Sequence, residues 1–162
     1  MSEPVYTISR NSPLGWLQIS GSAAGISKVE FTDNGQENNN PDIPEVLKNC
    51  CSQLTEYFEG KRQTFDLKIA PDGTGFQQKV WQQLQQIPFG QTRSYLDIAN
   101  AFGQPTYTRA VGSANGRNPL AIIVPCHRVI GANGSLTGYA GGLWRKKWLL
   151  QFEGVSRQGE LF

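Results

Sequence analysis

Residues 122–131, which read IIVPCHRVIG, lead from a run of β-branched apolar residues into a thiol, an imidazole and a guanidinium in succession. The apolar run predicts a short buried strand that ends at Pro125. Cys126 is followed by His127, the only histidine of the chain, and then by Arg128. Because a positive environment lowers the pKa of a thiol, this end of the strand predicts a reactive cysteine. A buried cysteine with a purely structural role remains the alternative.

The contact between Cys126 and His127 depends on the backbone between them. Adjacent side chains of a strand point to opposite faces. Unless the chain turns there, the thiol and the imidazole do not touch, and we expect a water molecule to bridge them.

The residues before this strand predict helices. Residues 76–87 carry apolar side chains at helical spacing and glutamines on the opposite face, which is typical of an amphipathic helix. Ser94 can cap a helix that runs to about residue 102, and Thr108 can cap a second one that reaches about residue 115. Two short helices across the tight turn at residues 103–105 predict a helix-turn-helix.

The first seventy residues predict a different kind of structure. Short alternating segments and turns indicate a small antiparallel meander, an exposed polar loop, a helix and a further strand. These elements are expected at residues 5–8, 15–20 and 25–31 for the meander, 33–42 for the loop, 44–59 for the helix and 65–69 for the last strand. The turn at residues 71–73 predicts a boundary between domains 1–72 and 73–162.

Charge is distributed unequally between these halves. The first seventy residues contain 6 basic and 9 acidic side chains, whereas the rest of the chain contains 9 and 4. Only the second half is expected to approach a polyanion such as DNA. The sequence thus predicts an α/β (α+β) fold, with a small N-terminal sheet-and-helix domain and a mostly helical C-terminal domain that carries the helix-turn-helix.

Other classes of protein are disfavoured by what the sequence lacks. Three cysteines, two of them adjacent at Cys50 and Cys51, do not suit a disulfide framework, and together with one histidine they do not form a zinc ligand set. No apolar run of membrane-spanning length and no phosphate-binding glycine loop occurs. We therefore expect a cytoplasmic monomer without metal, cofactor or membrane contact.

Five segments of the second half resemble, in the same order, segments of the O6-alkylguanine-DNA alkyltransferases, also called methylated-DNA–protein-cysteine methyltransferases. The most specific is PCHRVIG at residues 125–131, which resembles the active-site signature of that family. The others read IPFG with a following SY, RAVG, NP and GYAGG, and stand at residues 87–90, 94–95, 109–112, 118–119 and 138–142. The resemblance covers residues 76–154, whereas the first seventy residues resemble the family only in size and in element order.

This resemblance implies that the protein repairs double-stranded DNA that contains O6-alkylguanine, with alkylated thymine as an open second substrate. Cys126 is then the nucleophile that receives the alkyl group. His127 is a base that acts through water, and Glu153 is the carboxylate that orients the imidazole, in an order that resembles a hydrolytic triad.

The resemblance also implies how DNA is held. Tyr95 would push the phosphate of the target nucleotide and donate a proton to guanine, and Arg109 would fill the stack that the flipped base leaves. The other residues expected at DNA are Ala110, Gly112, Ser113, Asn115 and Arg128.

Four residues are expected to support the active site or its pocket. By the same resemblance, Asn118 braces the active-site turn, and Tyr139 lines the base pocket together with Val129 and Ala140. Ala140 stands where some family members carry serine, so a contact to the alkylated oxygen must come from a backbone N–H. The range of alkyl groups that the pocket accepts stays open.

A thioether has no easy route back to water, so each molecule is expected to repair one lesion and to be consumed. Two other functions remain open. A lesion-binding protein would flip bases without chemistry, which Cys126 argues against. A thiol hydrolase with Cys126, His127 and Glu153 would turn over an acyl or peptide substrate and ignore DNA.

Overall fold

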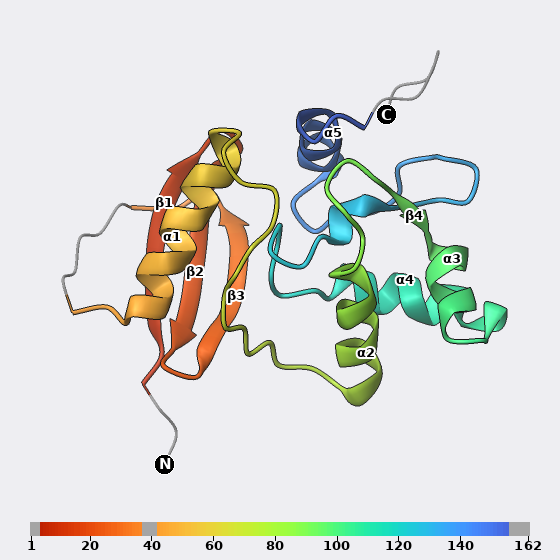
Figure 1. Cartoon of the computed structure of the whole chain (residues 1–162), viewed down its shortest axis with the longest axis horizontal. Helices are drawn as coiled ribbons and strands as arrows, with labels where there is room; N and C mark the ends of the chain where they lie inside the picture. The colour runs from red at the N-terminus through yellow and green to blue at the C-terminus, as the bar shows by residue number, and fades with distance from the viewer. Residues whose placement is uncertain (1–3, 37–41, 156–162) are drawn as a thin grey trace. The chain divides into compact units, whose positions relative to one another are not determined.

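The chain divides into two compact units in its computed structural model, which describes residues 4–36 and 42–155 (Figure 1). The N-terminal unit comprises Met1–Asp72 together with Pro119–Ile123, and the C-terminal unit comprises Gly73–Asn118 and Val124–Phe162. Part of the predicted loop at 33–42 lies outside the described residues. The chain therefore enters the N-terminal unit a second time, directly before the residues that contain Cys126.

Three antiparallel strands and one helix build most of the N-terminal unit, as the sequence predicts. The strands are β1 (Tyr6–Ser12), β2 (Gly15–Ser22) and β3 (Gly25–Thr32), and β2 lies in the middle of the sheet. Helix α1 (Glu45–Phe58) packs on this sheet (Figure 1). It buries side chains three and four positions apart, the pattern of an amphipathic helix; they are Leu47, Cys50, Leu54 and Tyr57.

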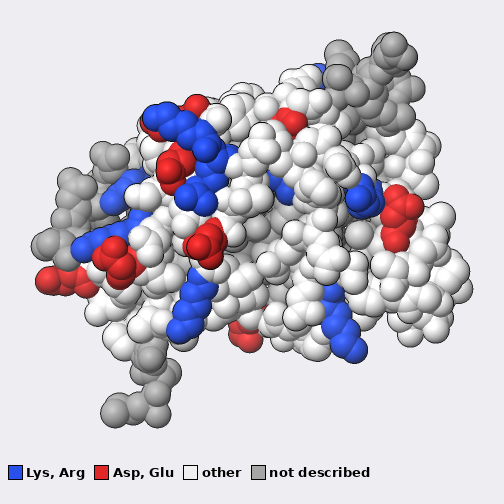
Figure 2. All heavy atoms as spheres, viewed as in Figure 1, with Lys and Arg blue, Asp and Glu red and all other residues white. Residues whose placement is uncertain are grey.

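Acidic and basic side chains lie next to one another over the N-terminal unit on the face that Figure 2 shows. Lys28 pairs with Glu30 at 3.3 Å, and Lys61 pairs with Glu59 at 3.1 Å. Exposed pairs of this kind contribute at most about 1 kcal/mol to stability. These pairs neutralise acidic side chains of the N-terminal unit, which is the more acidic of the two units.

The strand predicted at residues 65–69 is wrong, because only Ile69 forms a single parallel bridge, with Ile26. The side chain of Gln53 instead binds both backbone groups of Asp66. Its Nε2 donates to the carbonyl oxygen at 3.0 Å, and its Oε1 accepts from the N–H at 2.9 Å. Backbone bonds to β3 flank Ile69, since the Ile26 N–H donates to the Lys68 carbonyl oxygen at 2.9 Å and the Ala70 N–H donates to the Ile26 carbonyl oxygen at 2.7 Å, and the pairing is limited to this bridge.

Helices dominate the described part of the C-terminal unit. They are α2 (Gly75–Leu84), α3 (Tyr95–Ala101), α4 (Thr108–Gly116) and α5 (Leu143–Phe152). Ser94 caps α3 as predicted: its hydroxyl accepts from the Asp97 N–H at 3.0 Å, and the Asp97 carboxylate accepts from the Ser94 N–H at 2.8 Å. This reciprocal capping box fixes where Tyr95 enters its helix. Within residues 4–36 and 42–155, no helix is both long and apolar enough to span a bilayer.

The predicted helix-turn-helix is present as α3 and α4, joined through a short 3-10 turn, η1 (Pro105–Tyr107). The Trp81 indole of α2 donates from Nε1 to the Ala114 carbonyl oxygen at 2.9 Å and so holds α4 in place. Thr108 does not cap α4 as predicted, since its hydroxyl donates to the Pro105 carbonyl oxygen at 2.7 Å. The 3-10 turn runs directly into the helix, so the backbone is already helical at Thr108.

The strand predicted at residues 122–124 is a turn instead. Leu120 bridges to Val29 of β3, and the Ala121 N–H donates to the Val29 carbonyl oxygen at 3.0 Å. The backbone then reverses at Ile122, whose φ of 72° lies in the left-handed region that β-branched residues rarely adopt. The apolar side chains of residues 122–124 are buried, as predicted. Their apolar character therefore reflects burial and not pairing in a strand.

Candidate active site

Cys126 opens a 3-10 turn, η2 (Cys126–Arg128), in the C-terminal unit. Its side chain belongs to a residue that is only 7% exposed, and its N–H donates to the Val124 carbonyl oxygen at 2.8 Å. The two-residue strand β5 (Val129–Ile130) follows and pairs in parallel with β4 (Arg93–Ser94), which leads into α3. The backbone thus turns at the cysteine, whereas a strand would have placed its neighbour on the opposite face.

The thiol environment differs from the one that the sequence predicts. Burial raises the pKa of Cys126, and the Asn118 side chain and the charge of Lys146 lower it by less. Arg128 does not activate the thiol, because its guanidinium is bound to Glu153. The Asn118 Nδ2 also donates to the Val124 carbonyl oxygen at 2.8 Å, so this amide contacts the chain directly before the cysteine.

His127 and Glu153 form a buried pair. Nε2 of His127 lies 2.9 Å from Oε2 of Glu153, and both side chains are completely enclosed. Glu153 stands at the C-terminal end of α5, which holds it in place. Arg128 donates to the same carboxylate at 2.8 Å and 3.0 Å, and to the Ile87 carbonyl oxygen at 2.6 Å. One carboxylate therefore orients both the imidazole and the guanidinium.

The protonation states of this pair follow from its surroundings. Burial lowers the pKa of His127, although the bond to Glu153 acts in the opposite direction. Burial acts to raise the pKa of Glu153, but the hydrogen bonds from His127 and Arg128 lower it to about 2. The imidazole is thus neutral at pH 7 and faces a charged carboxylate. Since a carboxylate only accepts, Nε2 carries the hydrogen and Nδ1 carries the lone pair.

Nδ1 of His127 is a buried acceptor with no hydrogen-bond partner among residues 4–36 and 42–155. A buried polar atom without a partner is rare and costs stability, and a catalytic role or a bound water are among its explanations. On the residue next to a cysteine, an unpartnered lone pair is suited to accept a proton from the thiol through one water molecule.

Tyr95 lies at the first position of α3, where the resemblance leads us to expect it. Its hydroxyl oxygen accepts from Oγ1 of Thr137 at 2.9 Å. Burial raises the pKa of the Tyr95 hydroxyl, which therefore keeps its proton at neutral pH and can donate it. Gly112 of α4 lies beside the same ring, since a Cβ built on it would stand 3.8 Å from the ring.

Lys146 is a residue of this site that the sequence interpretation misses. It is fully buried in α5, its Nζ donates to the Thr137 carbonyl oxygen at 2.8 Å, and Nζ lies 6.0 Å from the Tyr95 ring centre. Burial lowers the pKa of Lys146 to about 8, while Cys126 acts to raise it. Helical spacing could have predicted that Lys146 is buried, because it precedes the buried Leu149 and Leu150 by three and four positions on one helix face.

Tyr139 and Ala140 lie in the segment that leads into α5. The Gly142 N–H donates to the Tyr139 carbonyl oxygen at 2.8 Å, and the φ of Gly142 is 94°, which favours glycine. Arg145 donates from Nη1 to the Gly141 carbonyl oxygen at 2.9 Å and holds this turn. Burial raises the pKa of the Tyr139 hydroxyl well above its usual value, so the hydroxyl stays neutral. Ala140 itself is exposed.

The residues expected at DNA divide by exposure. Arg109, Ala110 and Ser113 are exposed on α4, and Gly112 is half-buried. Asn115 is only 4% exposed, and its Nδ2 donates to the Cys126 carbonyl oxygen at 3.4 Å. Part of α4 is therefore accessible to a duplex, while Asn115 faces the active-site turn.

Two further expectations are revised by burial. Arg128 is 6% exposed with its guanidinium engaged by Glu153, so a direct contact to DNA does not fit its position. Val129 is completely buried in β5 and supports the turn from within.

No group of three or more histidine, cysteine, aspartate or glutamate side chains that could hold a metal ion occurs in the described part of the chain. The three cysteines are free, two in α1 and one in η2.

Two family models match the chain. The model described as 6-O-methylguanine DNA methyltransferase, DNA binding domain, matches residues 75–155. The model described as 6-O-methylguanine DNA methyltransferase, ribonuclease-like domain, matches residues 5–71. The second match therefore ends, and the first begins, close to the turn at residues 71–73.

Curated relatives and solved structures agree with these models. A methylated-DNA–protein-cysteine methyltransferase of Methanosarcina acetivorans is 49% identical over 93% of this chain and 99% of its own length. The constitutive one of Bacillus subtilis is 46% identical over 93% and 96%. The crystal structure of Mycobacterium tuberculosis OGT in complex with DNA is 44% identical over 91% of this chain and 92% of that one, with a TM-score of 0.82. The chain belongs to the methylated-DNA–protein-cysteine methyltransferase family.

Proposed function

We propose that this protein repairs alkylated DNA by transferring the alkyl group from O6 of guanine to Cys126. The observation that carries the proposal is the neutral His127, which is fixed by Glu153 at 2.9 Å and stands next to the cysteine in the turn η2. The family relationship and the exposed face of helix α4 in the helix-turn-helix support DNA as the partner. The protein is expected to act as a monomer.

Proton transfer to His127 starts the reaction. The Cys126 thiol is mostly protonated because burial raises its pKa. A water molecule passes the thiol proton to Nδ1 of His127, and Glu153 stabilises the imidazolium that forms. The thiolate therefore forms within the site, by proton transfer from Cys126 to His127.

Displacement at carbon completes the transfer. The Cys126 sulfur forms a bond to the alkyl carbon as the bond from that carbon to O6 breaks, and the electron pair of the broken bond moves into the guanine. Tyr95, whose hydroxyl keeps its proton at neutral pH, donates a proton to the leaving base, and the proton that His127 took from the thiol then restores the Tyr95 hydroxyl. The products are a thioether on Cys126 and an unmodified guanine, so each molecule reacts once.

Lys146 extends this set of groups by stabilising charge. It is buried, and its positive charge lowers the pKa of Cys126. A cation in a low-dielectric site stabilises a nearby thiolate far more than a cation in water does. We assign Lys146 the role of positioning residue for the thiolate and for Tyr95, the ring of which lies 6.0 Å from Nζ.

DNA enters from the side of α4. A duplex buries O6 of guanine, so the base must leave the stack before it can reach a buried thiol. Arg109 is exposed on α4 and is long enough to occupy the gap, while the small residues Ala110 and Gly112 let the helix approach the duplex closely. Tyr139 and Ala140 line the pocket that receives the base, and Asn118 holds the turn.

A reducing, cytoplasmic location fits the thiol chemistry. All three cysteines are free, and Cys126 must stay reduced to accept an alkyl group. We therefore place the reaction in the cytoplasm.

The test is mass spectrometry after reaction with excess duplex that carries one O6-methylguanine. Trypsin releases residues 118–128, in which Cys126 is the only thiol, and residues 49–61, which carry Cys50 and Cys51 as an internal control. We expect one methyl group on the first peptide, none on the second, and one lesion repaired per molecule. An unmodified first peptide from folded protein with an intact lesion would favour lesion binding, and repeated cleavage of an acyl substrate would favour a thiol hydrolase.

A further inference from the structure

Asn115 lies in the last turn of α4, where the backbone is held from two directions. The Trp81 indole binds the carbonyl oxygen of the preceding residue, Ala114, at 2.9 Å. The Asn118 N–H donates to the Asn115 carbonyl oxygen at 3.3 Å. The Asn115 side chain is only 4% exposed, although asparagine is usually found at the surface. A buried amide on such a rigid support is able to hold another group in a defined position.

The two ends of the Asn115 amide have different surroundings. Nδ2 donates to the Cys126 carbonyl oxygen at 3.4 Å, which is long for a hydrogen bond. The reverse orientation of the amide would bring two acceptors together, so Nδ2 must face this carbonyl and Oδ1 must face away from it. Oδ1 is buried and has no hydrogen-bond partner in the part of the chain that the structure describes. The amide therefore lies against the peptide that joins Cys126 to His127 and presents an acceptor that needs a donor.

The same turn thus has two buried acceptors that lack a donor among the described residues. The second is Nδ1 of His127, because the ring hydrogen is on Nε2, which faces Glu153. Each such atom is costly, since its bond to water is lost on burial and is not replaced. One water molecule carries two hydrogens and can satisfy both acceptors at once. Its oxygen is then left to accept the hydrogen of the Cys126 thiol.

We propose that Asn115 is the positioning residue for the water molecule that passes the proton from Cys126 to His127, an inference that rests on the function proposed above. The water donates one hydrogen to Oδ1 of Asn115 and the other to Nδ1 of His127. With Cys126 and His127 alone, the water could turn about the line between them. A third contact, to the rigid end of α4, fixes its orientation.

The proton transfer balances around this water. As the thiol hydrogen moves to the water oxygen, the hydrogen that pointed at Nδ1 moves to that nitrogen. The thiol becomes a thiolate and the imidazole becomes an imidazolium, while the water keeps two hydrogens and now donates one of them to the sulfur. The hydrogen bound to Oδ1 of Asn115 takes no part, so the water does not turn during the transfer. Asn115 therefore stabilises the thiolate–imidazolium pair as well as the resting state.

The titratable and charged groups that act on the thiol and the imidazole lie outside α4. They are Tyr95 of α3, Arg128 of η2, Tyr139, and Lys146 and Glu153 of α5. Burial raises the pKa of both tyrosine hydroxyls, which stay neutral. Burial lowers the pKa of Lys146 to about 8, so it is mostly charged below that pH. Substitution of Asn115 removes no charge, and a changed pH dependence of the thiol below pH 8 therefore reports the relay.

The test is the rate at which iodoacetamide alkylates Cys126 in the full-length protein, read at pH 6.5 and 7.5 from the tryptic peptide 118–128. A relayed proton leaves the net charge of the site unchanged, so the wild-type rate should differ less than about twofold between these pH values. Asn115→Leu keeps the size of the side chain but has no acceptor, and its thiolate must form by loss of a proton to solvent. Its rate should be about a hundredfold below the wild type at pH 6.5 and about tenfold below it at pH 7.5.

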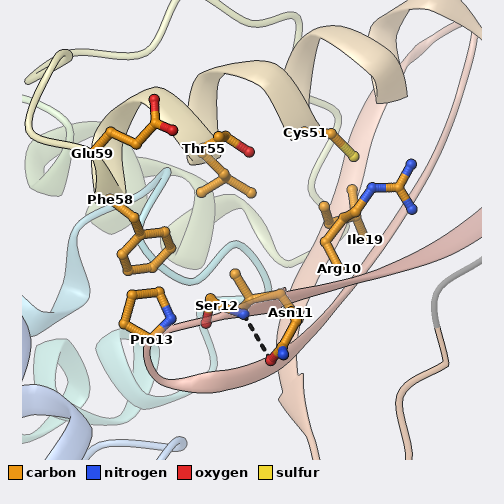
Figure 3. A pocket seen from close by; sticks show the side chains of 11 residues that line it. Arg10, Asn11, Ser12, Pro13, Ile19, Cys51, Thr55, Phe58 and Glu59 are labelled. Atoms are coloured by element: carbon orange, nitrogen blue, oxygen red, sulfur yellow. Dashed lines mark hydrogen bonds between the residues drawn. The ribbon is translucent and has the colours of Figure 1, made fainter.

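Cys51 provides an internal control, because it is a thiol of the same chain without a histidine beside it. It lines a cavity between the β1–β2 hairpin and α1 in the N-terminal unit (Figure 3). Burial raises its pKa, so its alkylation should rise about tenfold between the two pH values in every protein. Cys50 of the same peptide has a pKa of about 12 and reacts far more slowly. Asn100→Leu replaces an exposed asparagine of α3 and should leave the profile of Cys126 unchanged.

A purely structural role of Asn115 predicts a different result. It would lower the rate of Asn115→Leu by the same factor at both pH values, which would overturn the proposal, as would a wild-type rate that rises with pH like that of Cys51. Methyl transfer from excess duplex should show the same two losses in Asn115→Leu. A wild-type protein that transfers no methyl group would refute the proposed function, whereas the iodoacetamide profile would still decide the role of Asn115.

A crystal structure of the wild type decides the question if Asn115→Leu does not fold. One ordered water should lie within about 3.2 Å of both Oδ1 of Asn115 and Nδ1 of His127 and contact the Cys126 sulfur. A water bound to Nδ1 but not to Oδ1, or a protein donor bound to Oδ1, would overturn the proposal.

Discussion

Glu153 holds His127 through a 2.9 Å bond between Oε2 and Nε2, and neither side chain is exposed to solvent. The carboxylate also binds Arg128, so its charge is balanced even while the imidazole is neutral. A base that is neutral at rest and faces a permanent anion can take up a proton without creating an isolated buried charge. This relationship makes the pair suited both to catalysis and to holding η2 and the end of α5 together.

Removal of the carboxylate is expected to cost stability as well as rate. Glu153→Ala leaves the buried Arg128 without its anion, and the loss of one partner of a buried pair typically costs about 3–5 kcal/mol. Glu153→Gln keeps a hydrogen-bond acceptor and should be destabilised by less. Urea denaturation measures both variants, and equal stability of Glu153→Ala and the wild type would contradict the buried ion pair.

Titration of the same carboxylate should make the stability of the protein depend on pH. The folded pKa of Glu153 is lowered to about 2 from its usual 4.5, so its contribution is complete above pH 4.5 and is lost as the pH falls from 4.5 towards 2. The free energy of unfolding should therefore decrease in this window. Glu153→Gln lacks the titrating group, and its curve should be flatter there. Parallel curves for the two proteins would show that Glu153 is not the group responsible.

Cys126→Ser should abolish alkyl transfer, because a serine hydroxyl does not ionise at neutral pH. Its affinity for duplex DNA should stay close to that of the wild type, since the residue is only 7% exposed. A gel-shift titration with lesion-containing duplex measures affinity, and lesion analysis measures transfer. Residual transfer in this variant would assign the reaction to another residue.

Lys146→Met should raise the pKa of the Cys126 thiol and slow transfer at pH 7 about tenfold for each unit of that rise. Lys146→Arg keeps the charge and should recover part of the rate. Lys147→Met is the matched control, because this neighbouring lysine of α5 is only half-buried, whereas Lys146 is completely buried. The rate of Cys126 alkylation by iodoacetamide, followed against pH, reports the thiol pKa. An unchanged midpoint in Lys146→Met would refute the electrostatic role.

Arg109→Ala should impair repair of duplex DNA more than reaction with free O6-alkylguanine, because only the duplex requires a flipped base. We expect a difference of about tenfold or more, given that unstacking costs a few kcal/mol. Arg117→Ala removes an exposed positive charge from the C-terminal end of α4 and should leave the ratio of the two rates unchanged. Equal losses on both substrates in Arg109→Ala would exclude the flipping role.

The fold was predictable where local signals act alone. Ser94 was expected to cap α3 and does so, and the meander and α1 follow from alternation and helical spacing. Residues 122–124 were mistaken for a strand because β-branched composition does not reveal the pairing of Leu120 with Val29 or the left-handed backbone of Ile122.

The sequence predicts the cysteine and histidine of the candidate site but gives no comparable signal for its lysine. Lys146 and Lys147 are adjacent residues of the same type, yet the first is fully buried and the second is only half-buried. A charged side chain is normally expected at the surface. The two lysines differ only in the face of α5 on which each of them lies. Arg128 shows the converse, since a basic residue beside a nucleophile suggested activation or DNA contact, whereas its role is to bind Glu153.

The return of Pro119–Ile123 to the N-terminal unit has a consequence for how this protein can be divided or recombined. The Val29 N–H donates to the Pro119 carbonyl oxygen at 2.8 Å, and the Val29 carbonyl oxygen accepts from the Ala121 N–H at 3.0 Å. Both backbone groups of this β3 residue are therefore hydrogen-bonded by a segment that lies far along the sequence. A gene fragment that ends at residue 72 encodes a sheet without this segment, and one that begins at residue 73 carries the segment without its sheet. No single crossover exchanges one unit between relatives. A viable chimera needs three junctions, the last of them within three residues of the nucleophile, which ties the inheritance of the N-terminal unit to that of the active site.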